Sequence, residues 1–150
     1  RVKKEVLKTL GKIQSNESVV FLLQKLDVNN ASIKMQAAIS LGTLKAPAAV
    51  ESLGYLALKR GFSDENIEIR KEAVRSIGMI GGDNAAAILK KVLKKQVFWG
   101  RKQNDEVRSV AAITLGKIGG KDAMATLEEV SRKSKGIVQL ACKKAMEGIK

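Results

Sequence analysis

One helical pattern occurs five times along the chain, and it constrains the fold more than any other feature of the sequence. Each copy has a β-branched apolar residue, a basic residue beside it (glutamine in the fifth copy), a small or apolar residue three places later and an aliphatic residue four places after that. The copies span residues 2–11, 33–42, 69–78, 107–116 and 138–147. Glycine closes the first four copies, and we call this place the anchor position (residues 11, 42, 78, 116 and 147).

The apolar residues within each copy follow the period of a helix. In the fourth copy, one stripe of the helix contains Val107, Val110, Ala111, Leu115 and Ile118, a spacing typical of an amphipathic α-helix. A second apolar helical segment follows each of the first four anchors. We therefore predict nine helices, at about residues 2–14, 17–28, 31–44, 48–60, 65–80, 84–97, 105–119, 122–134 and 137–149.

A two-helix unit of this kind cannot bury its apolar face alone, so neighbouring units must stack. The predicted fold is all-α, a right-handed α-solenoid of about four and a half helix-turn-helix repeats. We expect one domain over residues 1–150, as a fragment of a longer chain. The small residues Ala37, Ala73 and Ala111 should be buried where helices approach closely.

The pattern resembles the HEAT repeat, specifically the short subclass that is also found in phycobilin lyase subunits. The resemblance covers essentially the whole chain, although the fifth copy departs from it with Gln139 and Glu147 in the basic and anchor positions. It implies that the basic residue of each copy pairs with loop carboxylates of the stack. A bilin lyase subunit is one functional alternative, which rests on the repeat resemblance alone.

One common catalytic residue type, histidine, is missing from the sequence. The chain has no histidine and a single cysteine, Cys142, at a position where three other copies have alanine. Serine–histidine and cysteine–histidine pairs and imidazole–metal sites are therefore excluded, and we predict a chain that is not an enzyme and has no cofactor. One cysteine fits a reducing compartment, and no apolar run is long enough for a membrane span, so we expect a cytoplasmic protein.

The charge of the chain is strongly positive. Lysine and arginine total 28 against 15 acidic residues, which gives a net charge of +13 and attracts anionic partners of any kind. The first four copies each have a basic residue at the same position: Lys3, Lys34, Arg70 and Arg108. This row can bind a phosphate backbone, but acidic residues flank it near helix starts, and we favour pairing within the stack.

Two insertions lengthen the spacing between copies and contain most of the aromatic residues. They lie at residues 60–63 and 97–101, after the second helix of a repeat, so stacking should place them side by side along one edge. The candidate binding surface is Phe62, Lys94, Lys95, Phe98, Trp99, Arg101 and Lys102. Three interpretations remain open: Phe98 and Trp99 fill the gap between lengthened repeats, anchor a protein interface, or stack on nucleic-acid bases.

The sequence therefore predicts a non-catalytic scaffold whose curved helical surface binds another protein or an adjoining domain of the same chain. The alternative is binding of DNA or RNA along a basic surface.

Overall fold

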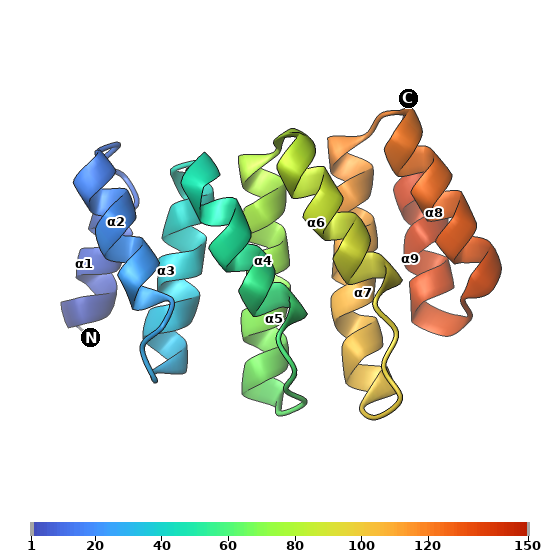
Figure 1. Cartoon of the computed structure of the whole chain (residues 1–150), viewed down its shortest axis with the longest axis horizontal. Coiled ribbons are helices and arrows are strands. Elements are labelled where there is room, and N and C mark those ends of the chain that lie inside the picture. Colours follow the sequence, from blue (N-terminus) through green and yellow to red (C-terminus); the bar gives the residue numbers. More distant parts are fainter. Residues whose placement is uncertain (1, 150) are drawn as a thin grey trace.

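The computed structural model describes residues 2–149 and is helical over most of them (Figure 1). The predicted all-α class with nine α-helices is confirmed for this part of the chain. The helices are α1 (Val2–Leu10), α2 (Asn16–Lys25), α3 (Ala31–Thr43), α4 (Val50–Leu58), α5 (Asp64–Ile80), α6 (Gly82–Lys94), α7 (Arg101–Ile118), α8 (Lys121–Lys133) and α9 (Gly136–Glu147). A short 3-10 helix, Pro47–Ala49, leads into α4.

The helices lie in two rows (Figure 1). The odd-numbered helices, α1 to α9, form one row in which each contacts the next, and α2, α4, α6 and α8 form the other. Each consecutive pair from α1–α2 to α7–α8 is one repeat, and α9 begins a fifth. The loops from one repeat to the next all lie along the lower edge of the molecule in Figure 1.

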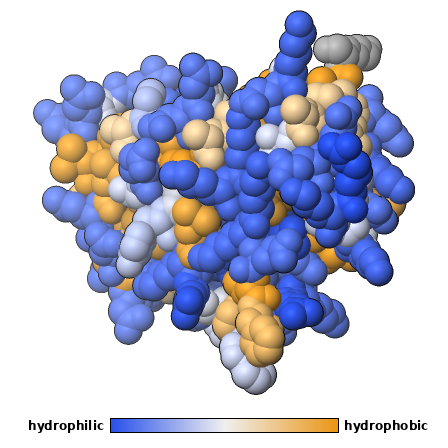
Figure 2. Space-filling model, turned by 45° about the vertical axis from the view of Figure 1, so that its right-hand side comes forward, coloured by the Kyte–Doolittle hydropathy of each residue, from blue (hydrophilic) through white to orange (hydrophobic). Residues whose placement is uncertain are grey.

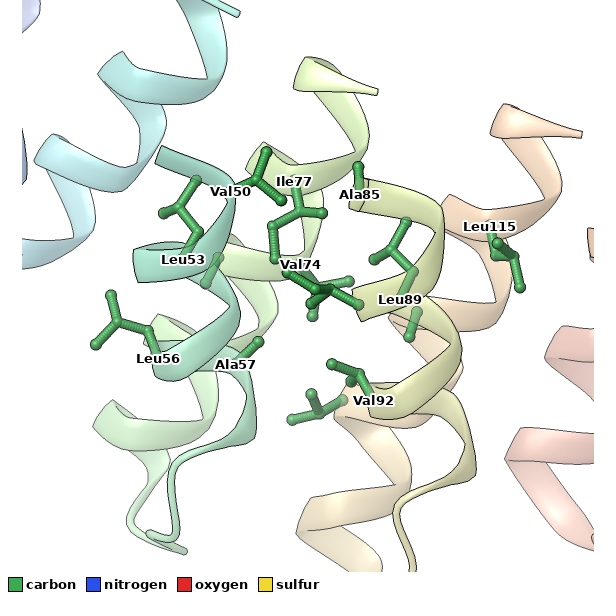
Figure 3. Packing of buried hydrophobic residues seen from close by; sticks show 14 of the residues in the cluster. Val50, Leu53, Leu56, Ala57, Val74, Ile77, Ala85, Leu89, Val92 and Leu115 are labelled. Atoms are coloured by element: carbon green, nitrogen blue, oxygen red, sulfur yellow. The ribbon is translucent and has the colours of Figure 1, made fainter. Parts of the chain in front are cut away.

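The hydrophobic core is a continuous layer between the two rows (Figure 3). In its centre, Leu53 of α4 and Leu89 of α6 pack with Val74 and Ile77 of α5. The three alanines predicted to be buried, Ala37, Ala73 and Ala111, have no solvent exposure. Burial of apolar side chains by neighbouring repeats is the main favourable term in such a stack.

The anchor glycines allow the odd-numbered helices to approach one another closely. Each faces a small residue that lies two places before the next anchor, which we call the small position. The contacts join Gly11 to Ser40, Gly42 to Ser76, Gly78 to Thr114 and Gly116 to Ala145. A Cβ atom on Gly42 would lie 2.8 Å from Cβ of Ser76, so a larger residue at an inner anchor would force the repeats apart.

The largest boundary differences from the prediction lie at the insertions and at the first turn. The helix α7 begins at Arg101 rather than near 105, because Gly100 adopts a left-handed conformation (φ 67°) that starts the helix early. The helix α1 ends at Leu10 rather than near 14, since Gly11 begins a turn. Among residues 2–149, none of the helices has both the length and the apolar character that crossing a membrane requires.

Candidate functional site

The two insertions lie in direct contact at the lower edge of the molecule. The loop of residues 59–63 follows α4, and the loop of residues 95–100 follows α6. The ring of Phe62 packs against the backbone of Gly100 so closely that a side chain at Gly100 would overlap it. We call these two loops, together with Arg101 and Lys102, the aromatic edge.

Phe98 and Trp99 project from the aromatic edge into solvent. Their exposed fractions are 74% and 76%, and Figure 2 shows an apolar group protruding from the lower edge among hydrophilic side chains. The two rings meet edge to face, with centroids 5.3 Å apart. The interpretation that these residues fill the gap between repeats is therefore wrong, and Phe62, which covers Gly100, comes closest to that role.

Arg101 and Lys102 begin α7 in an electrostatically unfavourable place. The first turn of a helix carries a partial positive charge, so cations there are destabilising by roughly 0.3–1 kcal/mol each. Other helices follow the usual rule, with Asp64, Asp83 and Asp122 in their first turns. The Arg101 guanidinium lies 5.7 Å from the centre of the Phe98 ring, a cation–π contact that holds it beside the aromatic pair.

Lys94 and Lys95, two members of the predicted surface, make bonds within the fold instead. Lys94 donates to Glu129 of the next repeat at 2.8 Å, and Lys95 donates to the carbonyl oxygen of Leu58. Burial, followed by the nearby charges of Arg70 and Arg60, lowers the pKa of Lys95. These two lysines therefore connect neighbouring repeats and are not free binding groups.

The basic stretch around α6 meets acids that are distant in sequence. Lys90 forms an ion pair with Asp122, as Lys94 does with Glu129. Hydrogen bonds from Lys94 and Lys133 lower the pKa of Glu129 to about 2. The sequence shows no acid between residues 83 and 105, but stacking supplies acids from α8, so the edge is less positive than the sequence indicated.

In the last three copies, the residue at the basic position bonds within the stack. Its side chain donates to a carbonyl near the end of the preceding even-numbered helix: Arg70 Nε to Ala57 at 3.0 Å, Arg108 Nε to Leu93 at 2.8 Å and Gln139 Nε2 to Ser131 at 3.1 Å. Gln139 thus acts like the arginines it replaces. The implied pairing with a loop carboxylate of the stack is not found at these positions: Arg108 pairs at 2.9 Å with Asp105 of its own helix, and Arg70 donates to Asn104.

Asn104 is the residue at this site that sequence reasoning missed. It is 1% exposed, accepts a 3.0 Å hydrogen bond from Arg70 Nη2 and donates to the Lys95 carbonyl at 2.8 Å. It thereby fixes the base of the 95–100 loop to two repeats. No sequence signal identified it, because residues 98–104 were expected to be loop rather than helix.

The single cysteine of the chain is a buried structural residue. Cys142 has no solvent exposure, and burial raises the pKa of its thiol. Because the thiolate is the reactive form, this environment disfavours nucleophilic chemistry at Cys142. Within residues 2–149, the acidic residues and this cysteine do not gather into a group of three or more that could hold a metal ion.

Comparison with known proteins supports the repeat assignment. The family model of the PBS lyase HEAT-like repeat matches residues 69–95, which correspond to most of α5 and α6. This confirms the predicted resemblance to the HEAT-like repeat of the phycobilin lyase type. No curated protein matches the chain in sequence.

One solved structure that the chain matches is human deoxyhypusine hydroxylase in complex with glycerol. The match has a TM-score of 0.40 and 16% identity, and it covers 97% of this chain and 78% of the hydroxylase. The sequence-based prediction that the chain is not an enzyme is corrected by this match, because the similar structure is that of an enzyme. At this TM-score and identity, the match assigns no activity to the chain.

Proposed function

We propose that the chain is a right-handed α-solenoid of HEAT-like repeats that binds another protein, or an adjoining domain, through its aromatic edge. The observation that carries this proposal is the exposure of Phe98 and Trp99, held together beside Arg101 on a loop that is fixed from within. Tryptophan and arginine are enriched among residues that dominate protein interfaces. The two rows of stacked helices support the solenoid assignment.

The aromatic pair offers enough apolar area to anchor an interface. A buried phenylalanine or tryptophan removes about 150–250 Å² from water, which corresponds to roughly 4–6 kcal/mol per ring at about 25 cal/mol per Å². Ordering costs reduce this gain in any real complex. Here the mutual contacts of Phe98, Trp99 and Arg101, with Asn104 at the base of the loop, already restrict the free state.

The charges around the aromatic pair favour an acidic partner surface. Arg101 and Lys102 are exposed, and so are Lys59 and Arg60 on the adjoining loop. Acidic groups of a partner at the start of α7 would also complement the positive end of that helix. Such groups would offset the local electrostatic cost of Arg101 and Lys102.

Nucleic acid is the competing ligand, and the salt dependence of binding separates the two classes. Lys90 and Lys94 are engaged with acids, which leaves fewer unpaired cations beside the edge for contact with a phosphate backbone. Binding of nucleic acid would weaken steeply with added salt, because each neutralised phosphate releases counterions. Binding of a protein through an aromatic anchor would depend on salt only modestly.

The test uses affinity capture with the whole chain and two matched aromatic variants. Trp99→Ala removes the anchor, and Tyr55→Ala removes an aromatic residue of similar exposure (67%) on α4. In a nuclease-treated lysate, we expect proteins that bind both the wild type and Tyr55→Ala. Their affinity for Trp99→Ala should be lower by about 30-fold, or roughly 2 kcal/mol. Equal capture by both variants would contradict the proposal.

A purified partner allows a direct measurement at the same edge. Trp99 is the single tryptophan of the chain, so its fluorescence reports on this loop. The tryptophans of the partner are replaced, or their fluorescence is subtracted. Acrylamide should quench Trp99 readily in the free chain and weakly in the complex. Quenching that remains unchanged on binding would place the interface elsewhere.

A further inference from the structure

A buried arginine between the second and third repeats has no acidic partner. Arg70 of α5 is 4% exposed, yet it forms no ion pair within residues 2–149, whereas the next residue, Lys71, pairs with Glu68. The Nε and Nη2 atoms of Arg70 donate to uncharged oxygen atoms, the Ala57 carbonyl and the Asn104 amide. Because buried charges in proteins are usually paired with an opposite charge, Arg70 is an exception that calls for a counterion.

The equivalent arginine of the next copy has its counterion within the chain. Arg108 pairs with Asp105, three residues before it, at 2.9 Å. The residue three places before Arg70 is Ile67, which belongs to the hydrophobic core. The fourth copy therefore supplies the negative charge itself, whereas the third copy has an apolar residue in its place.

Arg70 lines a small hollow at the lower edge of the molecule, where α4 ends and α5 begins (Figure 1). Four of the seven residues that line it are cations and none is an acid: Lys34, Leu56, Lys59, Arg60, Asn66, Ile69 and Arg70. Its volume is about 20 Å³, which admits roughly one water-sized group. The hollow beside Arg108, in contrast, includes Asp105 among its lining residues. We call the first hollow the basic hollow.

One nitrogen of the Arg70 guanidinium is left for a ligand. Its Nη1 atom has no hydrogen-bond acceptor within residues 2–149. In that part of the chain, Ser76 Oγ is the only fully buried side-chain polar atom without a partner, so Nη1 reaches the surface of the hollow that Arg70 lines. Burial, and then repulsion from Arg70 and Arg60, lowers the pKa of Lys95, and a bound anion would relieve that repulsion.

We propose that the basic hollow binds a dianionic phosphate group, which supplies the counterion that Arg70 lacks. A phosphate oxygen would enter and accept a hydrogen bond from Arg70 Nη1, with the other three cations around the outer oxygens. Several cations around one opening favour two negative charges over the single charge of a carboxylate, and the arginine guanidinium matches the geometry of phosphate. The site goes beyond the proposed function, because it needs neither Trp99 nor a protein partner.

The test follows thermal unfolding of the whole chain with inorganic phosphate and with acetate. Sodium chloride keeps the ionic strength constant, at about pH 8, where phosphate is dianionic. A ligand that binds only the folded chain raises its stability in proportion to ln(1 + [L]/Kd). Each variant is compared with its own stability in chloride alone.

Two glutamine substitutions at equivalent positions form the matched pair. Arg70→Gln removes the charge and keeps a donor to the carbonyl, as Gln139 does at the same position of the fifth copy. Arg108→Gln makes the same change where the arginine already has Asp105. Lys34→Gln tests the same hollow from α3, a residue whose side chain is only partly buried, should Arg70→Gln fail to fold.

We expect phosphate to stabilise the wild type and Arg108→Gln, and acetate to have little effect. Arg70→Gln and Lys34→Gln should each weaken phosphate binding about tenfold, as expected for the loss of a charge-assisted hydrogen bond. Trp99→Ala should bind phosphate as the wild type does, which separates this site from the proposed protein interface. A wild type that phosphate does not stabilise would overturn the proposal, and so would equal phosphate binding by all variants or an acetate effect as large as that of phosphate.

A second probe, O-phosphoserine, distinguishes two sources of the phosphate group. Binding tighter than that of inorganic phosphate would identify a phosphate ester of a larger molecule as the ligand, since the volume of the hollow leaves the rest of such a molecule outside. Equal or weaker binding would identify free phosphate. With either source, the loss of binding in Arg70→Gln and its retention in Arg108→Gln place the phosphate group in the basic hollow.

Discussion

The helices α1 and α7 have the same residue pattern but lie in different surroundings. Val107 and Ala111 of α7 have no solvent exposure, whereas Val2 and Val6 at the same positions of α1 are 78% and 45% exposed. The pattern therefore encodes a contact with a preceding neighbour, and burial follows only where that neighbour is present. Equivalent substitutions in the first and later repeats should then have unequal effects.

The basic position should give the largest difference. Arg108→Met removes a guanidinium that binds the carbonyl of Leu93, Asp105 and Ser134, and leaves buried acceptors unpaired. We expect a loss of about 3 kcal/mol in the free energy of unfolding, measured by urea denaturation. Lys3→Met, at the same position on exposed α1, should change it by less than about 0.5 kcal/mol; similar losses would refute the comparison.

The close approach of helices should give the next largest effect. Ala111→Leu adds three carbon atoms to a fully buried site, and overpacking of this kind costs about 1–3 kcal/mol. Val6→Leu enlarges the equivalent residue on α1, which is 45% exposed, and should be close to neutral. Thermal and urea unfolding of the two variants measure the difference, and a neutral Ala111→Leu would mean that this site can expand.

A single hydrogen bond between repeats should give a smaller effect. Ser40 of α3 donates from Oγ to the carbonyl of Leu7 at 2.9 Å, across the interface between the first two repeats. Ser40→Ala should lower the free energy of unfolding by about 1 kcal/mol. Thr9 holds the same position on α1 but bonds within its own helix, so Thr9→Ala should have less effect; equal losses would show that the inter-repeat bond adds nothing.

The smallest effect should come from the ion pairs between even-numbered helices. Lys94 and Lys133 lower the pKa of Glu129 to about 2, below the usual value of about 4.3. The stabilisation from Glu129 is therefore present above about pH 4.3 and is lost as the pH falls towards 2.

Glu129→Gln tests this pairing through the pH dependence of stability. The wild type should lose slightly more stability than Glu129→Gln between pH 5 and 2, and added salt should reduce the difference because the groups are exposed. Glu17→Gln, which removes a carboxylate without an ion pair within residues 2–149, serves as the control. The same slope in the wild type and Glu129→Gln would exclude a contribution from this pair.

The sequence was informative wherever a contact repeats with the pattern. The burial of Ala37, Ala73 and Ala111 follows from their common place in the copies, since every inner copy meets the same neighbours. The replacement of arginine by Gln139 looked like a departure, but its amide donates to the same kind of carbonyl. Residues at the same position of two copies can therefore have the same structural role although one is charged and the other is neutral.

The aromatic edge was only partly predictable. The insertions could be located because they interrupt the spacing, and their place after even-numbered helices put them on one edge. The exposure of Phe98 and Trp99 could not be derived from the sequence, because an aromatic side chain in a loop can be buried either against its own fold or against a partner. The pairing of Lys94 with Glu129 joins residues one repeat apart, which local charge patterns do not show.

The sequence by itself determined the secondary structure, the repeat and the residues that face the core. These features follow from helical periodicity and the anchor glycines, which are local properties that recur from copy to copy. The tertiary structure alone decided which of those surfaces are covered. The burial of Val107 and the exposure of Val2, at the same position of two copies, depend on whether a neighbouring repeat lies against them. Likewise, only stacking brings the acids of α8 to the lysines of α6, because that contact belongs to two repeats at once.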